Sequence, residues 1–140
     1  MTEIIGTDEF DMFMERNHLW DRVKNEKDFN ILQKLFLEGN LSYTLENELR
    51  IFIRLINKPL AVRSSSLFED SMSQPFSGIF RTYILPNNHS APEIRLKQLS
   101  EAVKLVFSSI YSRNARTYFE AINYKVEQEK MAVAIQEVVG

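Results

Sequence analysis

Residues 60–71 read LAVRSSSLFEDS, and residues 74–78 add QPFSG. Apolar Leu60 and Val62 ahead of a serine-rich turn predict a short buried strand that delivers Arg63 into that turn. Arginine stays charged at any working pH, and its planar fork of N–H donors matches phosphate oxygens. Serine hydroxyls and the backbone N–H groups of a turn can close around the same anion. An ordinary loop with local side-chain-to-backbone hydrogen bonds explains these residue types more simply, so alone they do not establish a phosphate site.

The order of several motifs along the chain adds to this evidence. AVRSS at residues 61–65 is followed by the pair Glu69-Asp70, by FSG at residues 76–78 and by Thr82. Further along come EAV at 101–103, SIYS at 109–112 and MAVAIQEVV at 131–139. In this order the motifs resemble the PEP/pyruvate-binding family, which includes phosphoenolpyruvate synthase, pyruvate phosphate dikinase and the rifampicin phosphotransferases. The resemblance covers about residues 59 to 140.

The resemblance implies an ATP-grasp-like fold in which ATP lies between two subdomains and its phosphates meet a mobile loop. It implies that Arg63 contacts the nucleotide phosphates and that Thr82 adds a hydroxyl beside them. Gly78 would bring backbone N–H groups close to the ligand, because a residue without Cβ lets a ligand approach the chain. Thr82 is also a common strand residue, and its hydroxyl could simply face water.

The same resemblance places the adenine at a hinge strand near the end of the chain. Gln136, with the backbone of Glu137 and Val138, would line the base there. Gln136 also lies in an alternating strand, where a polar residue is expected on the solvent face. Both interpretations of Gln136 stay open at this point.

The implied activity is that of an ATP-dependent phosphotransferase resembling pyruvate, water dikinase. Phosphate would pass from ATP through a phosphohistidine to pyruvate or a related acceptor, with both the histidine and the acceptor handled by the remainder of the enzyme. Mg²⁺ would accompany ATP, and its ligands are expected beyond Gly140. Glu69 and Asp70 could bind Mg²⁺, but as loop residues they are more simply turn caps or partners of a nearby cation.

Some family features have no counterpart in this chain. No Gly-Gly-Lys motif precedes Arg63, and neither His18 nor His89 matches the family's phosphorylated histidine. Phe119 stands where the family often has an arginine. These differences leave a second function open, that of a non-catalytic nucleotide-sensing or partner-binding module with the same fold. For the chain alone they predict no useful phosphoryl transfer.

Composition narrows the class of protein. The 140 residues suit one domain, and 44% hydrophobic with 26% charged residues is ordinary for a soluble globular protein. A net charge of −2 gives no basic excess for nucleic acid, and no apolar run is long enough for a membrane span. Cysteine is absent, which excludes disulfides and thiolate chemistry. A cytoplasmic protein without metal ligands of its own is the simplest fit. The chain has only four glycines, which is few for a complete nucleotide-binding domain, so we expect it to be a piece of a longer enzyme.

Apolar spacing predicts an α+β fold. Residues 1–58 are expected to be a helical segment of three helices, capped by Thr7 or Asp8, by Asp28 and by Thr44. The aromatic residues of the first two are expected to pack in a core or an interface rather than bind a cofactor. Residues 59–140 are expected to be a partial ATP-grasp-like nucleotide-binding subdomain. It would form a small, mostly antiparallel sheet from strands near Arg63, at 79–85 and at 131–139, with one long helix from Glu93 that bends near residues 112–114.

The last strand carries an expectation about assembly. Met131, Val133 and Ile135 are apolar, and a strand that ends the chain is expected to leave an unpaired edge. The sequence therefore predicts self-association as a homodimer, which would pair edge to edge or exchange its N-terminal helices.

Overall fold

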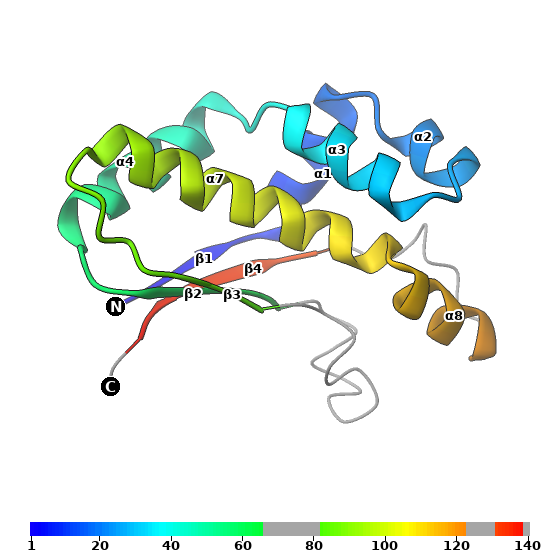
Figure 1. The fold of residues 1–140 in the computed structure, drawn as a ribbon. Helices are drawn as coiled ribbons and strands as arrows, with labels where there is room; N and C mark the ends of the chain where they lie inside the picture. Colours follow the sequence, from blue (N-terminus) through cyan, green and yellow to red (C-terminus); the bar gives the residue numbers. More distant parts are fainter. Residues whose placement is uncertain (66–81, 123–130, 139–140) are drawn as a thin grey trace.

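A computed structural model describes residues 1–65, 82–122 and 131–138, and they form two layers, helices over an antiparallel sheet. Figure 1 shows the helices gathered on one face of the sheet. The sheet has strand order β1-β4-β2-β3, with β1 Thr2–Ile5, β4 Val133–Glu137, β2 Leu60–Ser64 and β3 Thr82–Leu85. The helical layer consists of α1 Thr7–Arg16, α2 Trp20–Asn25, α3 Phe29–Glu38, α4 Tyr43–Leu55, α7 Pro92–Ser108, the 3-10 turn η1 Ser109–Tyr111 and α8 Arg113–Ala121. The α+β prediction is confirmed.

The predicted helix N-caps are confirmed in part. Asp28 caps α3, because its side chain accepts a hydrogen bond from the backbone N–H of Asn30 at 2.9 Å. Gly6 stands at the N-cap of α1, so the expected caps Thr7 and Asp8 lie inside the helix. The structure also corrects the cap of α4, which is Ser42 rather than Thr44.

Ser42 caps α4 because a tertiary contact holds its side chain. Its Oγ accepts from the N–H of Leu45 at 3.0 Å and donates to a carboxylate oxygen of Glu9 in α1 at 2.8 Å. Local sequence allows either hydroxyl to cap a helix, and the contact with α1 selects Ser42. The expected bend after the long helix is confirmed, since η1 and the capping residue Ser112 separate α7 from α8.

The first strand was missed by sequence reasoning, which expected residues 1–58 to be helical. β1 is only four residues long and is completed by antiparallel pairing with β4, for example Ile5 opposite Val133. This pairing corrects the expected edge at residues 131–139, because β4 lies between β1 and β2. Among the described strands, β1 and β3 form the edges. The driving force proposed for edge-to-edge association through β4 is therefore absent.

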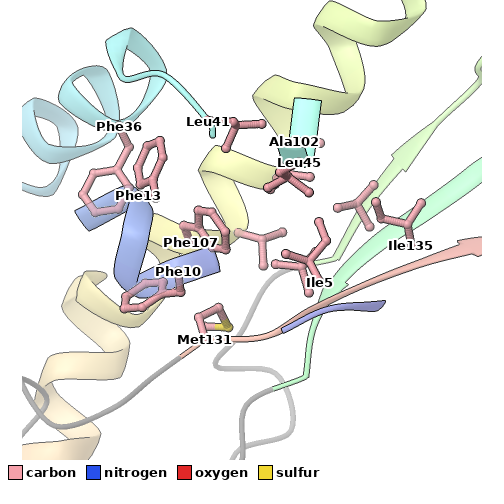
Figure 2. Close-up of a cluster of buried hydrophobic side chains, with 14 of the residues drawn as sticks. Ile5, Phe10, Phe13, Phe36, Leu41, Leu45, Ala102, Phe107, Met131 and Ile135 are labelled. Atoms are coloured by element: carbon pink, nitrogen blue, oxygen red, sulfur yellow. The ribbon is translucent and has the colours of Figure 1, made fainter. Parts of the chain in front are cut away.

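An aromatic cluster joins the helices above the sheet. Phe107 of α7 is fully buried, and its ring centroid lies 5.4 Å from those of Phe10 and Phe13, both in α1. Phe36 of α3 packs on Phe13 at 5.7 Å. Figure 2 shows these four rings with Met131 close by, next to the sheet. The prediction that the aromatic stripe of the first helices is core is confirmed. Among the described residues, no helix is both long and apolar enough to cross a membrane.

Glu3 introduces an unfavourable charge at the edge strand. Its side chain lies on the helical side of the sheet, because Glu3 is opposite the buried Ile135. Burial, and to a smaller extent repulsion from Glu48 of α4, raise the pKa of Glu3 above its ordinary value of 4.5. The folded state therefore favours the protonated acid more than the unfolded state does, and stability falls as the pH rises from the unfolded-state pKa through the folded-state pKa.

We expect Glu3→Gln to raise the urea midpoint of unfolding at about pH 7 and to change it little at about pH 3. Glu48→Gln, which relieves only the smaller of the two causes, should give a smaller gain. A Glu3→Gln variant that is less stable than the parent protein at neutral pH would contradict this account.

Candidate functional site

The face of the sheet opposite the helices carries the candidate site. The helices that contact the strands lie on one face, with α7 contacting β2, β3 and β4 (Figure 1). Side chains alternate along a strand, and residues opposite one another in neighbouring strands share a face. We call this second face the open face, because none of the described helices covers it. The strand register places two rows of side chains on it, Thr82-Arg63-Ala134-Ile4 and Ile84-Ala61-Gln136-Thr2.

Arg63 is the only charged residue in these two rows of described strand residues. It lies in β2, between Thr82 of β3 and Ala134 of β4, and is half-buried. Its Nε donates a hydrogen bond to Oε1 of Gln136 at 2.9 Å. Among the described residues, this is the hydrogen bond that Arg63 makes, and no carboxylate pairs with it. The site therefore presents, on the open face, a guanidinium that no carboxylate of the described residues neutralises.

The alternation of β2 explains why Arg63 points outward. Leu60, Val62 and Ser64 of the same strand are buried on the helical side. The start of the strand is fixed by pairing with β4, where the N–H of Val138 donates to the carbonyl of Pro59 at 2.8 Å. The predicted strand around Arg63 is confirmed. The strand predicted at 79–85 pairs with it antiparallel over Thr82–Leu85, and residues 79–81 lie outside the described residues.

A buried polar cluster holds the turn that leads into β2, and sequence reasoning missed it. Asn87 is buried with φ 52°, a conformation that asparagine tolerates better than most residues. Its Nδ2 donates to the carbonyls of Ile56 and Lys58 at 2.9 and 3.0 Å. Arg95 of α7 donates to the carbonyl of Ile53 at 3.0 Å. These hydrogen bonds connect the end of α4 and the segment before β2 to α7. They therefore fix where β2 begins relative to α7. The only sequence signal was a Pro-Asn-Asn turn.

Glu137 and Val138, for which the sequence predicts an adenine contact, lie at the end of β4, and their backbone N–H groups donate hydrogen bonds within the protein. The N–H of Glu137 donates to the carbonyl of Met1 at 3.1 Å, and that of Val138 donates to the carbonyl of Pro59, immediately before β2. The carboxylate of Glu137 contacts the Met1 ammonium at 3.2 Å and Lys58 Nζ at 3.4 Å. Hydrogen bonding to the ammonium, assisted by Lys58, lowers the pKa of Glu137 below its ordinary value. The adenine contact expected of Glu137 and Val138 stays a prediction.

The other candidate residues fall into two groups. Gly78, Glu69 and Asp70 lie outside the described residues. Thr82 is exposed, next to Arg63 on the open face. His89 lies exposed in the loop after β3, where its Nδ1 accepts from the N–H of Ala91 at 2.9 Å. The structure therefore brings together Arg63, Thr82 and Gln136.

A second group of cationic side chains, accompanied by carboxylates, lies in the helical layer. A cleft of about 510 Å³ between the start of α3 and α8 is lined by Lys27, Arg113 and Arg116, and by the carboxylates of Asp28 and Glu120. Arg116 has a structural role, because its guanidinium donates to two main-chain carbonyls at the end of α2, at 3.0 and 3.2 Å. The two remaining positive charges, Lys27 and Arg113, are matched by the two carboxylates of Asp28 and Glu120. This cleft is the natural competitor to the open face for an anionic ligand.

Comparison with known proteins relates the chain to a protein family and to a bacterial protein. Residues 2–140 match the family described as the pyruvate phosphate dikinase AMP/ATP-binding domain. The chain is also 27% identical over 139 residues to an uncharacterized phosphotransferase, YvkC, of Bacillus subtilis (strain 168). That similarity covers 97% of this chain and 15% of the relative, so the chain spans a small part of the relative's length.

Proposed function

Because the chain belongs to the pyruvate phosphate dikinase AMP/ATP-binding domain family, we propose that the open face of its sheet binds ATP through the phosphates. The observation that carries the proposal is Arg63, a half-buried guanidinium with no carboxylate partner among the described residues. A cation in this state attracts a phosphate more strongly than a fully solvated one, since its field is less screened. Thr82 adds a hydroxyl beside it.

The contribution of such a site to phosphoryl transfer is positioning and charge neutralisation. Negative charge on the phosphoryl oxygens must be offset in the transition state, and fixed cations do this without reorganisation. We propose that Arg63 supplies one such cation and that Gly78 supplies backbone donors. Mg²⁺ would neutralise further phosphate charge when bound, and no described residue is assigned to it. For the whole protein we propose transfer from ATP through a phosphohistidine to pyruvate or a related acceptor.

Titration calorimetry tests the proposal on the 140-residue chain. We expect saturable binding of ATP, competition by inorganic tripolyphosphate, and much weaker binding of adenosine, because the phosphates carry the recognition. ATP that fails to bind, or binding that tripolyphosphate does not compete with, would refute a phosphate-directed site.

Thr82→Val provides a finer test. Valine keeps the shape and strand preference of threonine but removes the hydroxyl, so we expect ATP affinity to fall about three- to ten-fold with little change in stability. Thr117→Val is the matched control, because Thr117 lines the cleft beside α8. A larger loss of ATP affinity in Thr117→Val than in Thr82→Val would show that ATP binds in that cleft and not on the open face.

A further inference from the structure

The pairing of Arg63 with Gln136 depends on the pattern of side-chain sizes on the open face. In the register of β2 and β4, Arg63 is opposite Ala134 and Gln136 is opposite Ala61. Arg63 and Gln136 are therefore diagonal neighbours on one face, at a separation that long side chains can bridge. The two alanines on the other diagonal are small, so they leave room for the side chains of Arg63 and Gln136 to meet. The result is the 2.9 Å hydrogen bond from Nε to Oε1.

This bond determines which edge of the guanidinium is available. Arginine can bind a phosphate side-on, through Nε and one terminal nitrogen, or end-on, through both terminal nitrogens. With Nε donating to Gln136, the side-on mode is blocked. The amide oxygen is neutral, so it holds the guanidinium without cancelling its charge. A carboxylate at position 136 would hold Arg63 in the same way but would compete with the phosphate.

We propose that Gln136 is a positioning residue, which holds Nε of Arg63 so that the two terminal nitrogens meet the phosphate end-on. The proposal rests on the proposed function, in that Arg63 is taken to bind phosphate. It gives the Gln136 side chain a different role from the adenine contact that the family resemblance implies.

The adenine and positioning roles predict different ligand profiles for Gln136→Met, which keeps the length of the side chain and removes the acceptor. If Gln136 positions Arg63, affinity for ATP and for inorganic tripolyphosphate should fall by the same factor, about ten-fold, with adenosine unaffected. Weaker binding of ATP and adenosine with unchanged tripolyphosphate binding would overturn the proposal in favour of an adenine contact.

A double-mutant cycle adds a second criterion. In an Arg63→Ala background, Gln136→Met should have no further effect on tripolyphosphate binding, because a positioning residue acts only through the group it positions. Additive losses from the two substitutions would contradict the proposal. If Arg63→Ala alone is harmless, the proposed phosphate role of Arg63 fails, and that result is separate from any effect of Gln136.

NMR of the arginine side chains tests the positioning without any ligand. In the parent protein the Nε–H of Arg63 should exchange slowly with water and give a distinct signal, and in Gln136→Met it should exchange rapidly. Equal exchange rates in the two proteins would show that Gln136 does not hold the guanidinium, whatever the outcome of the binding experiments.

Discussion

Replacing Arg63 with alanine is expected to weaken ATP binding by about 2–5 kcal/mol, the range for truncating one partner of a close charge pair. The free energy of unfolding should stay nearly the same. Among the described residues, Arg63 makes one hydrogen bond, to Gln136, and this bond lies on the open face rather than in the core. Titration calorimetry and urea unfolding of the same variant measure the two quantities.

Arg54→Ala is the matched control for the loss of one positive charge. Arg54 is exposed in the last turn of α4, in the helical layer, so its removal should change ATP affinity little. If the Arg63 variant loses stability while it retains ATP affinity, the arginine is architectural and the assignment is wrong.

Truncating Phe107 to alanine should have the largest effect on stability, about 3–5 kcal/mol. The side chain is fully buried, and its ring packs against Phe10 and Phe13 of α1 at 5.4 Å each. The loss combines the lost burial of the ring with a cavity between α1 and α7 that rigid neighbours cannot fill. Urea unfolding followed by circular dichroism gives the free energy.

Two comparisons make the Phe107 experiment specific. Phe107→Leu retains much of the buried volume and should lose less stability than the alanine variant. Tyr43→Ala removes an aromatic side chain that is 76% exposed and should have a small effect. A Phe107→Ala variant no less stable than Tyr43→Ala would mean that this aromatic cluster does not hold α1 and α7 together.

The sequence predicted those parts of the fold that depend on local pattern. The apolar stripe and Asp28 cap of α3, and the alternation around Arg63, are visible within a few residues. β1 was missed because its strand character comes from pairing with β4, more than 120 residues away, and four residues show too little alternation. The position of β4 in the interior of the sheet follows from the same distant pairing, so it could not be predicted either.

The candidate site, like the fold, could be predicted from the sequence only in part. Residue type and motif order drew attention to Arg63, Thr82 and Gln136 separately. Their relation required the strand register, because Arg63 and Gln136 lie 73 residues apart and meet only across β2 and β4. The buried bonds of Asn87 and Arg95 also join elements remote in sequence.

The location of bound ATP is the central claim, and ATP-induced chemical shift changes of the backbone amides test it most directly. The account predicts that the changes centre on the open face, at Arg63, Thr82 and Gln136, and leave α3 and α8 unaffected. Changes centred instead on the cleft lined by Lys27 and Arg113, with the open face unaffected, would contradict the account.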